Sequence, residues 1–300
     1  MPGDADLDPA AVAAAADGAV ARALAEDLDV APAAAPAERL AGDATTRATV
    51  PADARGRAAL VARADGVVAG TGMVARTFAA LDPDVTVHLD VVDGAEVARG
   101  EVLGTVVGPL ASVLTGERTA LNFLTHLSGI ATRTRAFARA VEGTGCVVRD
   151  TRKTTPGLRL LEKAAVRAGG GTNHRVGLWD ALLVKDNHVA AAGSITAATR
   201  QALAAAGDRH VQVEVTSLAE LREAVAAGAR DVLLDNFTPE GCREAVAVVA
   251  DADVLLEASG TIRLETVADY ARTGVHRVAV GALTHSAPQL DVALDIVQEG

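Results

Sequence analysis

Aromatic residues and cysteines are scarce in this 300-residue chain. Phe, Trp and Tyr together make up 2% of the residues, and the cysteines are Cys146 and Cys242. Two cysteines make neither a disulfide framework nor a metal-ligand spacing, so we expect a reducing, cytoplasmic compartment. Half of the residues are hydrophobic, which still predicts a globular fold built on small aliphatic side chains. Both cysteines and Trp179 are predicted to lie in the core.

The chain also lacks long apolar runs and net positive charge. No run approaches the roughly 18 apolar residues of a membrane span, and no basic region followed by an apolar stretch marks a targeting signal. The formal net charge of −11 disfavours a surface for nucleic acid or anionic lipid. Basic residues nevertheless concentrate in one segment, namely Arg149, Arg152, Lys153, Arg159, Lys163, Arg167, His174 and Arg175. This segment indicates a site for a small anion, although Lys163 and Arg167, spaced i, i+4, are predicted to be solvated surface charges.

The second half of the chain alternates β-rich runs with helical patterns. The predicted strands are Cys146–Arg149, Ala181–Val184, Val211–Val215, Asp231–Asp235, Val254–Glu257 and Arg277–Val280. The predicted helices are Ser217–Ala227, Pro239–Val249 and Leu264–Arg272. A strand-to-strand spacing of roughly 20 to 24 residues matches one βα unit with short loops. The pattern favours a parallel α/β barrel over an open doubly wound sheet, because no GxGxxG follows any of the strands.

The first half has a different pattern. A helix is expected over Ala10–Leu28, followed by short alternating runs at Gly66–Met73, Val85–Val92 and Val102–Val107. These runs, separated by turn residues, predict an antiparallel layer and hence a separate domain. A long helix from Thr115 to about Val141 is expected to join the halves. The stretch Leu290–Gln298 is predicted to be helical and either to close the barrel or to pack back on the first domain.

Charged residues and glycines follow the predicted barrel strands at their carboxyl ends. These strand ends carry Asp150–Lys153, Lys185–His188, Glu214, Asp235–Asn236, Glu257–Gly260 and Gly281–Ala282. In a parallel barrel these positions share one face, so we expect them to meet. Glu214 and Asp235 are either two ordinary carboxylates or a pair that holds Mg²⁺ together with substrate phosphates. The two glycine turns are either ordinary turns or the usual phosphate site of a barrel.

Two further features point to an anionic ligand. Arg152, Lys153 and Lys185 directly follow apolar strands, where partial desolvation is costly unless an anion meets the charge. The loop Gly169–Arg175 has three glycines followed by Thr172, Asn173, His174 and Arg175. A flexible linker would not need the two basic side chains, so the loop is predicted to present them to a ligand.

Several strings of the chain keep the order and spacing of a known family. They are Gly42–Thr46, Gly116–Asn122, Asp150–Gly157, Gly169–Arg175, Leu183–His188, Val213–Val215, Leu234–Asn236 and Val280–Thr284. Together they resemble the signatures of the quinolinate phosphoribosyltransferases, also called nicotinate-nucleotide pyrophosphorylases (carboxylating). The resemblance implies an incomplete, seven-stranded parallel α/β barrel preceded by an α/β sandwich domain. We therefore expect a sandwich domain at 1–128, a barrel domain at 129–284, and a return of 285–300 to the sandwich.

The resemblance also implies a reaction and a set of site residues. The reaction transfers phosphoribosyl from phosphoribosyl pyrophosphate to quinolinate, with loss of CO₂, and gives nicotinate mononucleotide. The implied quinolinate site is Arg118, Arg152, His174, Arg175 and Lys185, with Arg118 supplied by the partner of a homodimer. The implied phosphoribosyl pyrophosphate site is Thr151, Lys153, Ser259, Gly260, Gly281 and Ala282. The expected catalytic residues are Lys153, Lys185, Glu214 and Asp235, of which Glu214 and Asp235 would also hold Mg²⁺.

Two other functions remain open at this point. One is a pyrophosphorylase-like relative that accompanies molybdenum transport, which would share the fold but not the substrate. The other is a non-catalytic barrel that binds a phosphorylated metabolite. The number of cations favours a dicarboxylate acceptor over the first, and the two carboxylates at 214 and 235 disfavour the second. The assembly of dimers into hexamers is left open.

Overall fold

The structure is a computed structural model that describes residues 3–297. Its contacts divide the chain into two compact units, each described separately below. The sandwich unit comprises residues 7–133, 155–170 and 286–297, and the barrel unit comprises residues 3–6, 134–154 and 171–285. The predicted boundary lies near residue 128. The division by contacts instead falls after residue 133 and also assigns residues 155–170, which include α6 packed on α1, to the sandwich unit. Within the described range, no helix is long and apolar enough to cross a membrane.

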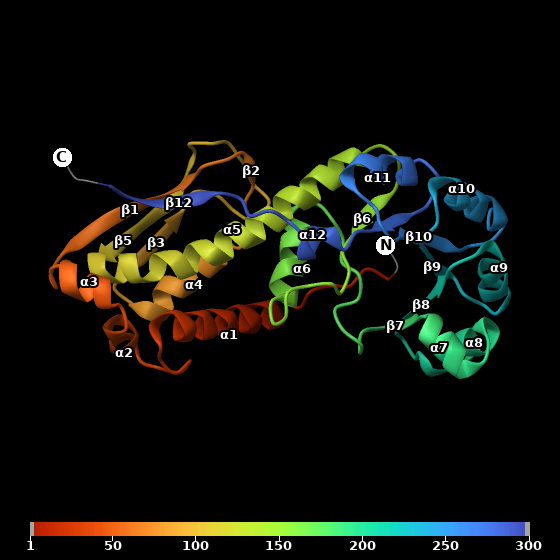
Figure 1. The fold of residues 1–300 in the computed structure, drawn as a ribbon, viewed down its shortest axis with the longest axis horizontal. Coiled ribbons are helices and arrows are strands. Elements are labelled where there is room, and N and C mark those ends of the chain that lie inside the picture. Colours follow the sequence, from red (N-terminus) through yellow and green to blue (C-terminus); the bar gives the residue numbers. More distant parts are fainter. Residues whose placement is uncertain (1–2, 298–300) are drawn as a thin grey trace. The chain divides into compact units, whose positions relative to one another are not determined.

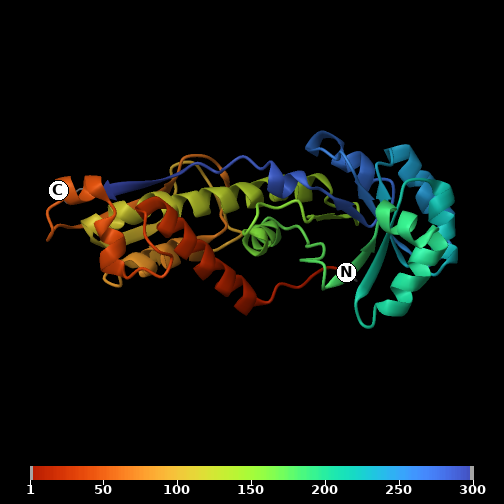
Figure 2. The ribbon, with the colours of Figure 1, turned by 60° about the horizontal axis from the view of Figure 1, so that its bottom comes forward.

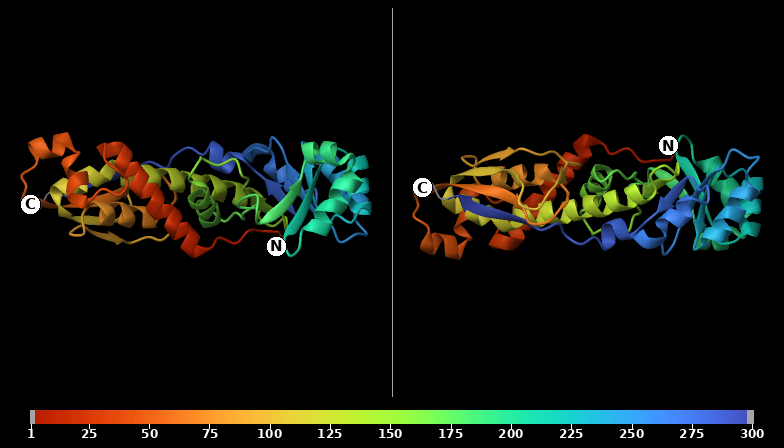
Figure 3. Two further views of the ribbon diagram at one scale, coloured as in Figure 1. Left: turned by 90° about the horizontal axis from the view of Figure 1, so that it is seen from below. Right: turned by 90° about the horizontal axis from the view of Figure 1, so that it is seen from above.

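The sandwich unit is built on a four-stranded antiparallel sheet. Its order is β12 (Val292–Val297), β1 (Arg55–Ala62), β5 (Val102–Pro109) and β3 (Thr86–Leu89). Figure 3 shows β12 in blue beside β1 in orange, and Leu60 pairs with Leu294 in that ladder. Alternate residues of β1, from Ala58 to Ala62, are buried, because successive side chains of a strand point to opposite faces. One face of the sheet is therefore apolar and needs a cover.

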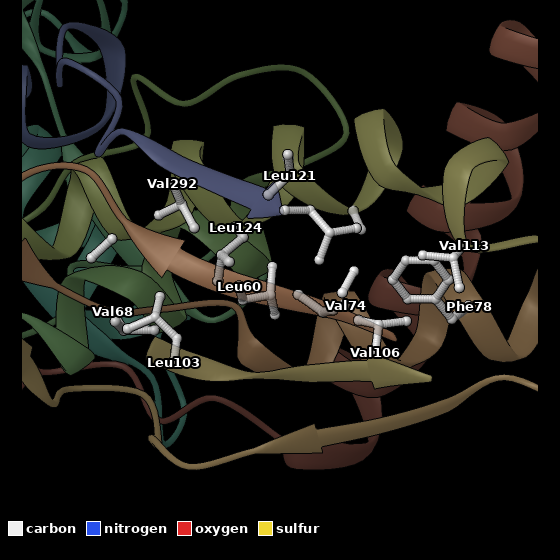
Figure 4. Packing of buried hydrophobic residues seen from close by; sticks show 14 of the residues in the cluster. Leu60, Val68, Val74, Phe78, Leu103, Val106, Val113, Leu121, Leu124 and Val292 are labelled. Carbon is white, nitrogen blue, oxygen red and sulfur yellow. The ribbon is translucent and has the colours of Figure 1, made fainter. Parts of the chain in front are cut away.

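Two helices supply that cover. They are α4 (Thr71–Leu81) and α5 (Leu110–Ala140), of which residues up to Arg133 belong to this unit. Figure 4 shows Val74 and Phe78 of α4 in one cluster with Leu60 of the sheet, and all three are fully buried or nearly so. The other elements of the unit are α1 (Pro9–Leu28), α2 (Pro36–Ala41), α3 (Ala44–Thr49), α6 (Arg159–Ala168) and the two-stranded pair of β2 (Gly66–Val67) and β4 (Glu96–Val97). Both α4 and α6 pack against α1.

The barrel unit contains a six-stranded parallel sheet. Its order is β6 (Val147–Arg149), β11 (Arg277–Ala279), β10 (Leu255–Ser259), β9 (Asp231–Asp235), β8 (His210–Val215) and β7 (Ala181–Val184). The first strand of this unit along the chain, β6, pairs with the last, β11, while β6 and β7 stand at the two ends of the sheet. A parallel bridge joins Arg149 to Thr172 on the free side of β6. The predicted incomplete barrel is confirmed, and a one-residue bridge takes the place of its seventh strand.

Helices follow these strands along the chain. They are α7 (Asp186–Ala192), α8 (Ile195–Ala205), α9 (Leu218–Ala226), α10 (Pro239–Val248), α11 (Leu264–Ala271) and α12 (Ala282–His285). Figures 1 and 2 show α8, α9 and α10, in green to blue, along one side of β8, β9 and β10. Ser194, Ser217 and Thr238 begin three of these helices, each accepting a backbone N–H three residues later. The carboxyl ends of the strands thus remain at one mouth of the unit.

One wrong prediction in the first half concerns the segment Gly66–Met73. The predicted strand Gly66–Met73 ends at Val67, and α4 begins at Thr71. The carboxylate of Asp93 accepts hydrogen bonds from the backbone N–H groups of Gly70 and Thr71 at 3.0 and 2.9 Å and so caps the helix from a distant loop. Local sequence carries no sign of a cap that is 22 residues away.

Two neighbouring strands of the sandwich sheet, β12 and β1, were also predicted wrongly or missed. The segment Leu290–Gln298 is not a helix, because Val292–Val297 forms β12 and pairs with β1 (Gln298 lies outside the described residues). Its predicted return to the first domain is confirmed, but as a strand. The central strand β1 was missed altogether. Cross-strand pairing, which the local pattern does not display, decided both segments.

Two single residues also differ from prediction. Trp179 is 69% exposed, and its ring lies against Gly177 in a turn that the Asp180 carboxylate fixes through two backbone N–H groups. Lys163 is fully buried, as is the adjacent Glu162, because α6 is enclosed on more than one side. The predicted burial of Cys146 and Cys242 is confirmed, and both thiols are free.

Candidate functional site

A cavity of about 600 Å³ lies at the carboxyl ends of the barrel strands. Its lining includes ten of the predicted site residues, namely Thr151, Arg152, Lys153, His174, Arg175, Lys185, Glu214, Asp235, Ser259 and Gly260. Leu183, Leu233, Asn236, Thr261 and Ala279, which were not predicted as site residues, complete it. Among the described residues that line the cavity, Arg118, Gly281 and Ala282 do not appear.

Two hydrogen bonds hold the loop after β6 in place. The Thr151 hydroxyl accepts the backbone N–H of Lys153 at 3.0 Å, and the Thr284 hydroxyl donates to the Lys153 carbonyl at 2.7 Å. A Cβ on Gly281 would lie 3.1 Å from Cδ of Lys153, so the turn at Gly281 supports the stem of this lysine. The Gly281–Ala282 turn therefore acts next to Lys153 and outside the cavity wall.

The glycine-rich loop is attached to the same strand. The N–H of Thr172 donates to the Val148 carbonyl at 2.9 Å. Asp150 is fully buried, and its two carboxylate oxygens accept the backbone N–H of His174 and the side-chain amide of Asn173, both at 2.7 Å. Asp150 thereby sets the start of the segment that carries both predicted cations. Sequence reasoning gave Asp150 no role, because its environment depends on a loop more than 20 residues away.

Two arginines give the cavity its positive character. Burial, followed by the charge of Arg152 and opposed by Asp180, lowers the pKa of Arg175 below its ordinary value. Within residues 3–297, the Nε atoms of Arg152 and Arg175 are buried without a hydrogen-bond partner, whereas Nη1 of Arg175 donates to the Ala181 carbonyl at 3.1 Å. A buried donor without an acceptor costs about 1–3 kcal/mol. An anionic ligand in the cavity would remove that cost for both arginines.

His174 is buried, and both of its ring nitrogens have protein partners. Nδ1 accepts the backbone N–H of Arg175 at 2.7 Å, and Nε2 lies 2.8 Å from Oε1 of Gln212. The ring therefore lines the cavity while its nitrogens are engaged within the protein. Its predicted contact with quinolinate stays a prediction.

A lysine and two carboxylates also line the cavity. Lys185 donates to Glu214 in a close ion pair, and the lysine side chain is 42% exposed against 12% for the glutamate. Asp235 stands directly opposite Ser259 in the β9–β10 ladder and accepts the Asn236 side-chain amide at 2.8 Å. Within residues 3–297 no group of three or more His, Cys, Asp or Glu could hold a metal ion alone. The two carboxylates suit Mg²⁺, which is bound through one or two carboxylates together with substrate phosphates.

Asn236 is a cavity residue that sequence reasoning did not select. Its φ of 58° is left-handed, a conformation that asparagine tolerates better than most side chains. A Cβ on Gly260, where φ is 129°, would lie 2.5 Å from Oδ1 of Asn236, so only glycine fits there. Sequence reasoning could have found Asn236 from its position, because it directly follows Asp235 at the end of a buried strand.

Comparison with known proteins agrees with this geometry. The family models for the N-terminal and C-terminal domains of quinolinate phosphoribosyl transferase match residues 43–128 and 130–295. The nicotinate-nucleotide pyrophosphorylase [carboxylating] of Mycobacterium leprae is 46% identical over 286 residues, which cover 92% of this chain and 95% of that protein. The probable enzyme of the same name from Bacillus subtilis (strain 168) is 45% identical over 240 residues, 80% of this chain and 83% of its own.

Solved structures show the same fold. The nicotinate-nucleotide pyrophosphorylase from Francisella tularensis superposes with a TM-score of 0.87 at 35% identity and covers 95% of this chain and 96% of that one. Both domains are matched by the family models, and the residues that line the cavity fall within the range matched by the C-terminal model. The chain therefore belongs to the quinolinate phosphoribosyl transferase family.

Proposed function

We propose that the chain is a nicotinate-nucleotide pyrophosphorylase (carboxylating) of NAD biosynthesis. It converts quinolinate and phosphoribosyl pyrophosphate into nicotinate mononucleotide, pyrophosphate and CO₂. The observation that carries the proposal is the presence in one cavity of two arginines, each with a buried Nε donor that lacks an acceptor, beside a lysine and two carboxylates. Such a cavity suits a substrate with more than one negative group.

The arginines and Lys185 would bind quinolinate. Quinolinate is a pyridine with two adjacent carboxylates, and a guanidinium can hold a carboxylate through two parallel hydrogen bonds. Arg152 and Arg175 lie on neighbouring segments, after β6 and in the glycine-rich loop, so each can meet one carboxylate. On binding, Lys185 would exchange its contact with Glu214 for one with the substrate, leaving the glutamate free for the second substrate.

The remaining residues would bind phosphoribosyl pyrophosphate. Lys153 and the Ser259-Gly260 turn supply a cation and backbone N–H groups for phosphates, and the Gly281-Ala282 turn supports Lys153. Glu214 and Asp235 would hold Mg²⁺ and the ribose hydroxyls. When bound, Mg²⁺ compensates the charge of the pyrophosphate group.

The reaction requires positioning and charge stabilisation and no side-chain nucleophile. The bond between C1 of the ribose and pyrophosphate breaks, its electron pair leaves with pyrophosphate, and the pyridine nitrogen forms a bond to C1. The positive charge of the nitrogen then stabilises the electron pair that is left on the adjacent ring carbon as CO₂ departs. A proton taken up at that ring carbon completes the balance. Lys153 would stabilise the leaving group, and Arg152 and Arg175 would orient the ring.

The proposal includes a homodimer with shared sites. Arg118 is an exposed residue of α5 in the sandwich unit and does not line the described cavity. In the proposed assembly the Arg118 guanidinium reaches the cavity of a second copy of the chain. Free, buried thiols at Cys146 and Cys242 support a reducing, cytoplasmic compartment.

The assay of purified protein tests the function directly. Quinolinate, phosphoribosyl pyrophosphate and Mg²⁺ are supplied, and nicotinate mononucleotide is followed by chromatography, with nicotinate as a parallel acceptor. We expect product with quinolinate as acceptor and none with nicotinate. Nicotinate has one carboxylate, so it would leave one of the two carboxylate-binding cations in the pocket without a partner. Product from neither acceptor, with folded protein, would contradict the proposal.

A further inference from the structure

A chain of buried polar side chains runs from the interior of the barrel unit to the cavity. Gln212, Asp231 and Glu257 come from β8, β9 and β10, and each is at most 2% exposed. Arg277 donates to Asp231 at 2.5 Å, and Arg149 donates to Glu257 at 2.7 Å. These ion pairs hold both carboxylates in place behind the cavity wall. Gln212 connects them to His174, which lines the cavity.

The orientation of the Gln212 amide is determined by these carboxylates. The amide nitrogen lies 2.8 Å from Oδ1 of Asp231 and 3.0 Å from Oε2 of Glu257. Oε2 of Glu257 also accepts from Arg149, and the other carboxylate oxygen of Asp231, Oδ2, accepts from Arg277, so both carboxylates are acceptors. The NH₂ group must face them, so Oε1 faces Nε2 of His174 at 2.8 Å. An amide oxygen can only accept. Nε2 of His174 therefore carries a proton.

The other ring nitrogen has the opposite role. Nδ1 of His174 lies 2.7 Å from the backbone N of Arg175, and a backbone N–H can only donate. Nδ1 is thus unprotonated, and the ring is the neutral Nε2–H tautomer. Asp150, which accepts the backbone N–H of His174, holds the same peptide from the other side.

We propose that Gln212 and His174 are positioning residues that fix the backbone at Arg175 and so direct its guanidinium toward a substrate carboxylate. This assignment rests on the proposed function, because it takes that carboxylate to be one of quinolinate's. His174 then acts through Nδ1 as a neutral acceptor and contributes no positive charge to the cavity. Gln212, which does not line the cavity, acts through the tautomer of His174.

Two replacements of His174 separate this role from a charged contact. The variant His174→Asn has a side-chain oxygen near the position of Nδ1, so it keeps an acceptor for the backbone N–H of Arg175. The variant His174→Gln has an amide N–H near the position of Nε2, so it keeps a donor for Gln212 but loses the acceptor for Arg175. We expect KM for quinolinate to rise about tenfold in His174→Gln, the loss of one hydrogen bond near the site, and about threefold or less in His174→Asn. KM for phosphoribosyl pyrophosphate should change little in either variant.

An equal rise of KM in the two variants would overturn the proposal, because both remove the positive charge that a protonated His174 would carry. A larger rise in His174→Asn would overturn it as well. Circular dichroism on both variants establishes that they fold, and wild-type turnover of quinolinate is measured first. If the wild type does not turn over quinolinate, the proposed function is contradicted. The tautomer of His174 is then still tested by the measurement described next, which needs no substrate.

The tautomer is measured without substrate. In protein labelled with nitrogen-15 at histidine, the His174 signals are identified by their loss in His174→Asn. We expect one protonated nitrogen at Nε2 and one unprotonated at Nδ1. Gln212→Met, which removes the acceptor at similar volume, should give mixed tautomers and raise KM for quinolinate about threefold to tenfold. Gln201→Met, at an exposed glutamine of α8, is the matched control and should change neither. A doubly protonated or Nδ1–H ring in the wild type would overturn the inference.

Discussion

Arg152 lies in the cavity with part of its guanidinium buried and lacking an acceptor, so its loss should be felt mainly in substrate binding and turnover. In Arg152→Ala the substrate carboxylate that this arginine is proposed to hold would be left desolvated and unpaired, at a cost on the order of 3–5 kcal/mol. That cost corresponds to a fall of roughly two to four decades in kcat/KM for quinolinate, measured by steady-state kinetics.

The control for Arg152 is an arginine of the same unit that lies outside the cavity. Arg243 is exposed on α10 and pairs with Glu240 one turn away. Arg243→Ala should leave kcat/KM within about a factor of two, since exposed ion pairs contribute little. Near-normal turnover of Arg152→Ala would show that this residue does not clamp the substrate.

Asp231 provides a prediction about stability and pH. Burial tends to raise the pKa of Asp231, but the His210 hydrogen bond, the charge of Arg277 and the Gln212 hydrogen bond outweigh it and hold the pKa below its ordinary value. Its contribution to stability is then fully present above the unfolded-state value of about 3.9 and is lost as pH falls through the folded-state value. At pH 7, Asp231→Asn should lower the free energy of unfolding by on the order of 3–5 kcal/mol, because Arg277 loses its partner in the interior.

The measurement is the midpoint of urea unfolding of wild type and Asp231→Asn across pH 3 to 7. The difference between the two proteins should be constant near neutrality and shrink on the acid side. Asp251→Asn, at an exposed position of the same unit, should follow the wild type throughout. A difference that grows as pH falls would mean that the carboxyl is protonated in the folded protein.

The strand-end pattern predicted which charged side chains meet, but not how each is held. Arg152, Lys185 and Asp235 were found because charges that directly follow apolar strands must share one mouth of a parallel barrel. Asp150 and Gln212 were given no role, because their effect depends on partners on other strands and loops. Residues that line the cavity can thus be predicted from their position along the chain. The residues behind them cannot, because their roles depend on contacts with distant segments.

At the scale of single elements, α4 shows how a distant residue sets a local structure. Asp93 accepts from two backbone N–H groups and from the Thr71 hydroxyl at the start of this helix. Removing a helix cap costs about 0.5–2 kcal/mol. We therefore expect Asp93→Ala to lower the free energy of unfolding by about 1 kcal/mol and to speed amide exchange at Thr71.

Urea unfolding and hydrogen exchange measure the two effects. Asp53→Ala, at an exposed position before β1, serves as the control for loss of one surface carboxylate. Unchanged exchange at Thr71 in Asp93→Ala would mean that Gly70 alone, with its left-handed backbone, is enough to begin the helix.

The elements of the barrel unit were easier to predict than those of the sandwich unit. The buried parallel strand β9 is a nearly continuous apolar run, and the helix α10 that follows it begins at the local cap Thr238, so the signal lies within the segment. In the sandwich unit, β1 and β12 depend on each other across more than 200 residues of chain. Their pairing and the cap of α4 are long-range interactions, which explains why all three elements were predicted wrongly or missed.

At the scale of the whole molecule, Arg118 makes the proposed homodimer testable. It is an exposed residue of the sandwich unit, whereas Lys185 lines the cavity of the barrel unit. If each cavity takes its Arg118 from the other subunit, Arg118→Ala and Lys185→Ala should each be inactive as homodimers. A heterodimer of the two variants, however, has one cavity in which both residues are intact.

Mixing the two inactive variants should therefore restore activity. After subunit exchange in an equal mixture, half of the dimers are mixed and each has one intact cavity of two, so about one quarter of wild-type activity is expected. Subunit exchange is followed with differently tagged chains, and a mixture of Lys185→Ala with Lys185→Met is the control that cannot complement. If each subunit used its own Arg118, every cavity of the mixed dimer would lack one residue, and confirmed exchange without recovered activity would rule out the shared site.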